Sequence, residues 1–298
     1  MEFTAVASGL FFLEAPREHD GAVWFTDVVR GGLRRLRPDG RIDEWLPGRK
    51  WIGGIVPNDD GAVLCSGGDG IAWVNPATGD SGMLLDAIYG QPIRGVNELH
   101  PDGEGGLYFG TADVAEVEHG GERGPSALFR LHPDGRVEQL ADGFAFTNGI
   151  GVSPDGRRLY MSDTGVGPYA FDVLVDGSVG PRELLAEIPD CDGLAVDCEG
   201  GIWIACLMSG VLTRLSPDGT IDRRVELPTP GVTSVSFGGT DQRDVYVTTT
   251  APDALEALMN KSTPSATASL YHARCDVAGH PVGRTSFRLG VGLNTTIG

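Results

Sequence analysis

One short pattern recurs six times along the chain and constrains the fold more than any other feature. Each copy is a turn, usually of the Asp-Gly or Gly-Gly kind, followed by an apolar strand that carries an aromatic residue or Leu. The key residues of the six copies are Trp24, Leu64, Tyr108, Tyr160, Trp203 and Tyr246. They are 40, 44, 52, 43 and 43 residues apart, which is the repeat length of a four-stranded propeller blade. The repeats therefore predict an all-β fold, a six-bladed β-propeller with four-stranded antiparallel blades.

The local pattern within each copy also indicates strands. Residues 22–27 alternate with period two, which places successive side chains on opposite faces of a sheet. Pro-Asp-Gly turns, which allow tight reversals between strands, begin at Pro38, Pro133, Pro154 and Pro217. One short helix is expected at residues 253–260, inside the last copy.

The two ends of the chain predict how the ring closes. Residues 2–7 read as a strand without a blade of its own, and the last repeat, which ends near Leu289, lacks one strand. We expect these to pair, because closure hides sheet edges that would otherwise invite aggregation. Residues 1–298 are then a single propeller domain, with 291–298 as a loose tail.

Composition limits the possible partners. The formal net charge is -18, whereas nucleic acid and anionic membranes are bound chiefly through clusters of Lys and Arg. We therefore expect small-molecule or cation partners, with no nucleic acid, no membrane and no obligatory protein partner. No apolar run approaches the roughly 20 residues that span a bilayer, and no basic segment followed by an apolar run marks the N-terminus for export. A cytoplasmic location is the expectation.

The cysteine and histidine patterns do not suggest a soft metal site. Five cysteines, none in Cys-x-x-Cys spacing, argue against a disulfide framework and a thiolate zinc site, so we expect buried thiols. The six histidines show no ligand spacing to one another and are expected at the surface or in turns.

Polar residues at equivalent blade positions indicate a site on the propeller axis. The central channel is lined by the start of each innermost strand, and four polar residues stand there in otherwise apolar or turn surroundings. They are Glu14, Asn97, Asn148 and Asp192, each 10 to 12 residues before the key residue of its blade. Two carboxylates and two amide oxygens at one height would bind a hard divalent cation and leave positions open for water or substrate.

At these residues the chain resembles the family of gluconolactonase, senescence marker protein 30 (regucalcin) and luciferin-regenerating enzyme. The resemblance runs from about residue 8 to residue 289, and its markers occur in order at blade spacing. They are Glu14 ahead of 22–27, Asn97-Glu98-Leu99, Asn148-Gly149, Asp192-Gly193 ahead of 201–206, and 233–239 ahead of 245–249. By this resemblance, the metal is held at Glu14, Asn148 and Asp192, and Asn97 binds metal-bound water or substrate.

The resemblance implies a metal-dependent lactonase, which hydrolyses a cyclic ester by metal-activated water. The cation would polarise the carbonyl, and Asp192 would act as general base. Asn97 and Asn148 would hold water and oxyanion, while Glu14 would supply charge and geometry. Ligands of these types accept several ions: calcium leads on hardness, and zinc, manganese, magnesium and iron(II) stay open.

The substrate contacts depart from the family pattern. Sugar-lactone members usually carry Arg two residues before the residue that matches Asn97, where this chain has Gly95, with Arg94 beside it. The family's acidic residue after Gly-Thr is displaced here to Asp113 or Glu116, and either could contact substrate. The loop 112–126 could be a lid or a solvated charged loop.

Large apolar residues near the mouth leave open the kind of lactone. Trp51, Tyr89, Phe146 and Met208 could face it, so the substrate is a sugar lactone or another small, possibly aromatic, lactone.

Two alternatives remain from the sequence. The same site could serve another metal-dependent reaction, such as phosphotriesterase- or arylesterase-like hydrolysis, or a dehydratase or isomerase that stabilises an enolate. The chain could also be a non-catalytic calcium-binding propeller, since fold does not fix function.

Overall fold

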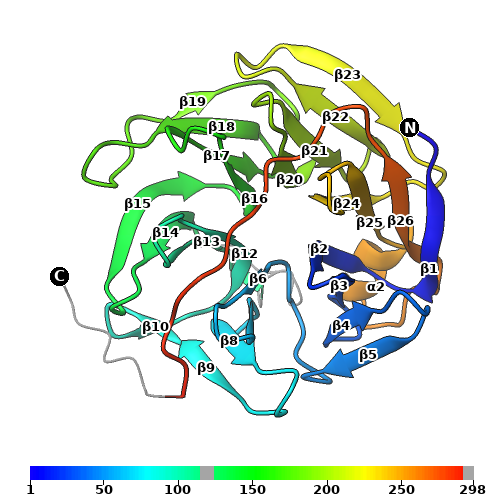
Figure 1. Cartoon of the computed structure of the whole chain (residues 1–298), viewed down its shortest axis with the longest axis horizontal. Coiled ribbons are helices and arrows are strands. Elements are labelled where there is room, and N and C mark those ends of the chain that lie inside the picture. The colour runs from blue at the N-terminus through cyan, green and yellow to red at the C-terminus, as the bar shows by residue number, and fades with distance from the viewer. Residues whose placement is uncertain (115–123, 291–298) are drawn as a thin grey trace.

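A computed structural model describes residues 1–114 and 124–290, and its strands form the predicted ring of six sheets (Figure 1). Each blade is a four-stranded antiparallel sheet, and the strands of five blades follow one another in chain order. The loose tail expected at 291–298 and the middle of the expected lid lie outside the described residues. Among the described residues, no helix is long and apolar enough to span a membrane.

Five blades run outward from the axis in chain order. The first two comprise β2 (Leu13–His19), β3 (Ala22–Asp27), β4 (Leu33–Leu36) and β5 (Ile42–Trp45), then β6 (Ile55–Pro57), β7 (Val63–Cys65), β8 (Ile71–Val74) and β9 (Ser81–Leu85). The third and fourth comprise β12 (Val96–Pro101), β13 (Leu107–Thr111), β14 (Ser126–Leu131) and β15 (Val137–Phe144), then β16 (Thr147–Val152), β17 (Arg158–Asp163), β18 (Gly167–Asp172) and β19 (Glu183–Leu184). The fifth comprises β20 (Cys191–Val196), β21 (Ile202–Cys206), β22 (Val211–Leu215) and β23 (Ile221–Glu226).

The sixth blade closes the ring with both ends of the chain, as predicted. Its strands are β24 (Val232–Gly238), β25 (Asp244–Thr249), β26 (Ala268–Arg274) and, outermost, β1 (Thr4–Leu10). β1 pairs antiparallel with β26, for example at Thr4 and His272. The innermost strands β2, β6, β12, β16, β20 and β24 contact one another in turn around the axis.

The predicted turns and the predicted helix are present. The glycines of the four Pro-Asp-Gly turns all take a positive φ, which Gly adopts without steric cost. The short helix α2 (Ala254–Met259) lies in the connection between β25 and β26. A two-stranded hairpin, β10 (Ala87–Ile88) with β11 (Gln91–Pro92), joins the second blade to the third.

The last repeat differs from the expectation, because it ends at β26 and not near Leu289. Residues 275–289 form a strap that crosses the ring (red in Figure 1). The strap is tied to the far ends of the innermost strands: His280 N–H donates to Val196, and Thr285 N–H donates to Pro57. The strap therefore covers the channel on the face where the innermost strands end.

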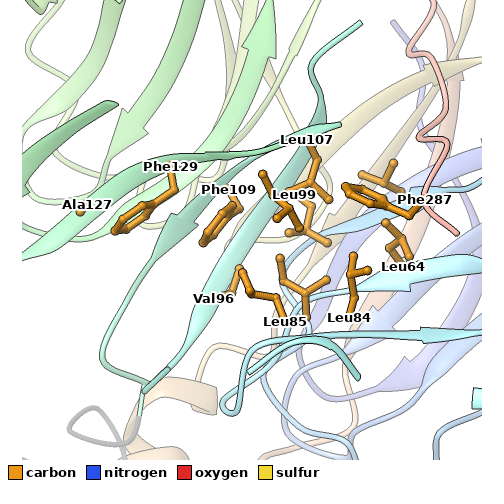
Figure 2. Packing of buried hydrophobic residues seen from close by; sticks show 13 residues of the cluster. Leu64, Leu84, Leu85, Val96, Leu99, Leu107, Phe109, Ala127, Phe129 and Phe287 are labelled. Atoms are coloured by element: carbon orange, nitrogen blue, oxygen red, sulfur yellow. The ribbon is translucent and has the colours of Figure 1, made fainter. Parts of the chain in front are cut away.

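The strap is anchored in the largest core cluster. Phe287, only 3% exposed, packs with Leu64, Leu84 and Leu107 between the second and third blades (Figure 2). The amide of buried Asn58 accepts the Phe287 N–H at 2.9 Å and donates to the Phe287 carbonyl at 3.0 Å. These contacts satisfy backbone groups that would otherwise be buried without partners.

Replacing Phe287 with Ala should lower the free energy of unfolding by about 3 kcal/mol, because it leaves a cavity between two blades. Urea unfolding followed by Trp fluorescence measures the change. The neighbouring exposed Arg288→Ala is the control, with an expected change within about 0.5 kcal/mol. Equal stability of the two variants would show that the strap does not contribute to the core.

Candidate functional site

The four polar residues chosen from the sequence occupy one structural position. Each is the second residue of an innermost strand: Glu14 in β2, Asn97 in β12, Asn148 in β16 and Asp192 in β20. All four therefore lie near the end of the channel away from the strap. Glu14, Asn148 and Asp192 are between 3% and 8% exposed.

A β-bulge occurs at this position in each of these blades. Between Glu14 and Arg17, for example, β2 advances three residues while β3 advances two. The same extra residue interrupts the pairing after Val96, Thr147 and Cys191. Bulges re-aim side chains and are common next to functional sites. At the bulge in β2, Ala15 takes a φ of 50°, an uncommon conformation for a residue with a side chain.

The glycines that follow two of these residues are required by strand packing. Asn148-Gly149 and Asp192-Gly193 resemble turn sequences, but both lie inside strands. A Cβ on Gly149 would lie 2.2 Å from the Leu194 nitrogen, and one on Gly193 would lie 2.1 Å from the Ser234 hydroxyl oxygen. The innermost strands therefore approach so closely at this height that only Gly fits.

Hydroxyl groups of neighbouring blades fix the backbone beside the site residues. Thr233 donates to the Leu13 carbonyl at 2.6 Å, and Ser66 donates to the Asn97 carbonyl at 2.7 Å. Thr164 donates to the Cys191 carbonyl at 2.7 Å. Each bond links two blades, so the site residues are held at fixed positions around the axis.

The two amide side chains are oriented by their own donors. The Asn97 amide donates to the Thr147 carbonyl at 3.1 Å, and the Asn148 amide donates to the Thr164 hydroxyl at 3.2 Å. The neighbouring Asn148 side chain also lowers the pKa of the Asp192 carboxyl, against the larger effect of burial. Because the bond to Thr164 uses the nitrogen of Asn148, it leaves the amide oxygen for a cation.

Buried negative charge dominates the electrostatics of the site. Burial raises the pKa of Glu14 well above its ordinary value, and the nearby charges of Asp192 and Glu98 raise it further. Burial also raises the pKa of Asp192, with the charge of Glu98 adding to the effect. Within the described chain, neither Glu14 nor Asp192 forms an ion pair with a basic side chain. A bound cation would compensate this charge.

Glu98 is a functional candidate that the sequence reasoning missed. Its carboxylate is buried and accepts the Leu99 N–H at 2.9 Å, and burial raises its pKa to about 7. The side chain fits because a glycine, Gly54, faces it: a Cβ there would lie 2.5 Å from a Glu98 carboxylate oxygen. The signal in the sequence was a carboxylate between the apolar residues Val96 and Leu99.

The donor set suits a hard divalent cation. The described residues contain no group of three or more His, Cys, Asp and Glu side chains arranged to hold a metal, so an amide oxygen is needed to complete a site. Glu14, Asp192 and Asn148 supply two carboxylates and one amide oxygen. Oxygen donors of this kind bind calcium and magnesium, and they leave coordination positions for water or substrate.

Two of the residues expected to contact substrate lie together in one pocket. Arg94 and Asp113 pair with each other at 3.1 Å and line a pocket of about 290 Å³ with Gly95. Glu116 lies outside the described residues, as does most of the 112–126 loop. Of the residues named for an aromatic mouth, Tyr89 is 50% exposed and Met208 is 72% exposed.

The expectation of buried thiols was wrong for one cysteine. Cys198 is exposed, although the other four cysteines are buried and all five are free thiols. His100 lies in β12 and His280 in the strap; both are half-buried and line a small cavity of about 30 Å³ in the lower channel together with Arg17. Burial lowers the pKa of His100 to about 3, so its ring is neutral there.

Comparison with known proteins shows to which family the chain belongs. A family model described as the SMP-30/gluconolactonase/LRE-like region matches residues 13–251. The chain belongs to this family. One similar protein, the pentonolactonase of Haloferax volcanii, is 31% identical over 292 residues, which cover 91% of this chain and 95% of that protein.

Two further relatives agree with the family assignment. The 6-deoxy-6-sulfogluconolactonase of Pseudomonas putida is 31% identical over 238 residues, covering 76% of this chain and 78% of that protein. The crystal structure of a calcium-binding protein, regucalcin, from Agrobacterium tumefaciens superposes with a TM-score of 0.77 at 22% identity, covering 96% of this chain and 97% of that one. This likeness confirms the family's propeller fold.

The raised pKa of Glu98 predicts a pH effect on stability. Between its ordinary value of 4.5 and about 7, the folded state binds more protons than the unfolded state, so the unfolding free energy falls as pH rises through this window. Without divalent cations, wild type should lose up to about 3 kcal/mol relative to Glu98→Gln from pH 4.5 to pH 7.5. Urea unfolding at several pH values measures the difference. Parallel curves for the two proteins would contradict it.

Proposed function

We propose that the protein is a metal-dependent lactonase that hydrolyses a small cyclic ester. The observation that carries the proposal is the convergence of two buried carboxylates, which form no ion pair within the described residues, with oriented amide side chains at the end of the channel away from the strap. The family and the lactonases among its relatives support the reaction class.

The ligands follow from the donor set. Glu14, Asn148 and Asp192 would hold one divalent cation, with calcium favoured by oxygen-only donors. When bound, the cation supplies Lewis acidity that polarises an ester carbonyl and lowers the pKa of a nearby water. The Asn148 side chain, fixed by Thr164, would present its oxygen toward the cation.

The remaining steps belong to side chains of the chain itself. Asp192 would accept a proton from the attacking water as general base. Asn97 has one N–H committed to the Thr147 carbonyl, so its second N–H and its oxygen are available to position water or the substrate oxygen. Glu14 and Glu98 would supply negative charge, and their burial excludes bulk water from the ligand oxygens.

Metal dependence can be tested with the protein stripped by EDTA. In a pH-stat assay with sugar, aliphatic and aromatic lactones, acid release should appear only when a divalent ion is added back. The fastest lactone in the panel would show whether Gly95 has removed the contact to sugars. Hydrolysis at the full rate after stripping, or no hydrolysis with any ion, would contradict the proposal.

Replacing Asp192 with Asn should lower kcat/KM at least about 100-fold, because it removes the general base and one ligand charge. The exposed Asp59→Asn, which removes the same charge on the strap side of the ring, is the matched control and should keep wild-type activity. In thermal unfolding, added Ca²⁺ should raise the Tm of Asp59→Asn and should change the Tm of Asp192→Asn little. Full activity in Asp192→Asn would exclude it as the base.

A further inference from the structure

The only two lysines of the chain meet at one pocket. Lys50 and Lys261 are 211 residues apart in a sequence whose other basic side chains are all Arg or His. Both line a pocket of about 660 Å³, and Arg30 is a third cation on its wall. In a chain of net charge -18, this gathering of positive charge stands out from the rest of the surface.

These cations have no carboxylate partner. Across residues 1–114 and 124–290, none of Arg30, Lys50 and Lys261 forms an ion pair, whereas buried arginines such as Arg130 and Arg214 are each held by two or more carboxylates. The carboxylate nearest in sequence to Arg30, that of Asp27, accepts the backbone N–H groups of Phe11 and Arg30. The pocket therefore carries positive charge that no carboxylate of the described residues neutralises through an ion pair.

The rest of the pocket is mostly apolar. Phe11, Val29, Ala257 and Leu258 contribute hydrocarbon surface, and Ser262 and Thr263 add hydroxyl groups. A ligand that matches this lining has an apolar segment and an anionic end.

The pocket opens on the same face as the candidate site. Phe11 comes three residues before Glu14, so the two lie within about 11 Å of each other. Ile52, two residues after Lys50, accepts a hydrogen bond of 2.6 Å from Thr26, which pairs with Glu14 between β2 and β3. Another part of the pocket wall comes from α2 and the residues after it, and α2 lies beside the first and sixth blades (Figure 1).

From these observations we infer that the pocket is a subsite for the acidic group of an extended lactone, one that carries a carboxylate or sulfonate at the end of an apolar spacer. The inference rests on the proposed lactonase function and narrows its substrate class. The cations would bind the acidic group, the apolar wall would cover the spacer, and the lactone ring would lie over Glu14, Asn148 and Asp192.

The test uses lactones that differ only at the end of the side chain. One γ-lactone carries an alkyl chain of roughly 10 Å that ends in carboxylate, a second ends in sulfonate, and a third ends in a neutral carboxamide. At low salt, kcat/KM for the acids should exceed that for the amide about tenfold. In Lys50→Gln/Lys261→Gln this preference should fall to about threefold or less, because only Arg30 of the three cations remains, with kcat/KM for the amide unchanged.

A charge-matched control separates a local subsite from a general field. Arg157→Gln/Arg224→Gln removes two exposed cations that do not line the pocket, so it should keep the preference for acids. An unchanged preference in the lysine variant, or an equal loss in both variants, would overturn the subsite. A preference for only one of the two acids would identify that group as the ligand of the subsite.

Failure of the lactonase proposal can be told apart from failure of the subsite. The matching lactams, which resist hydrolysis, are titrated into each protein by calorimetry. If no lactone is hydrolysed but the acidic lactam binds wild type more tightly than the lysine variant, the subsite stands without the reaction. Equal binding of acidic and neutral lactams to wild type would overturn the subsite, whatever the lactones do.

Discussion

The close approach of the innermost strands around the axis is the constraint on which the rest of the structure depends. At the height of Gly149 and Gly193, neighbouring strands leave no space for a Cβ. This contact brings side chains from separate blades together without any loop to position them, and hydroxyls such as Thr233 and Thr164 lock the backbone between blades. A site built in this way is rigid before any ligand arrives, which lowers the entropic cost of binding one.

Such rigidity has an electrostatic cost. Glu14, Glu98 and Asp192 are all buried, the charges of Asp192 and Glu98 disfavour ionisation of Glu14, and the charge of Glu98 disfavours ionisation of Asp192. The packing that concentrates the carboxylates also prevents them from moving apart, so the metal-free fold holds repulsion that a cation would relieve. The strap contributes by covering the opposite end of the channel.

The repeat pattern was sufficient to predict the fold and the height of the site. Blade spacing and turn residues determined the six sheets, and equivalent positions in the blades located Glu14, Asn97, Asn148 and Asp192 in the channel. The sequence could not show that Asn148-Gly149 lies in a strand, because the reason is a neighbour from another blade. Glu98 and the lysine pocket were missed for the same reason, because each depends on residues that are close only in three dimensions. Glu98 faces Gly54 of another blade, and the two lysines of the pocket are 211 residues apart in the sequence.

The central claim is that one divalent cation is held by side chains of three blades. The most direct measurement is anomalous diffraction from crystals soaked with Mn²⁺, which reports the position of the ion independently of activity. The account predicts a single strong peak on the axis, within bonding distance of oxygens of Glu14, Asn148 and Asp192. It also predicts that the peak is absent from Asp192→Asn crystals. A peak elsewhere, or none beside the buried carboxylates, would contradict it.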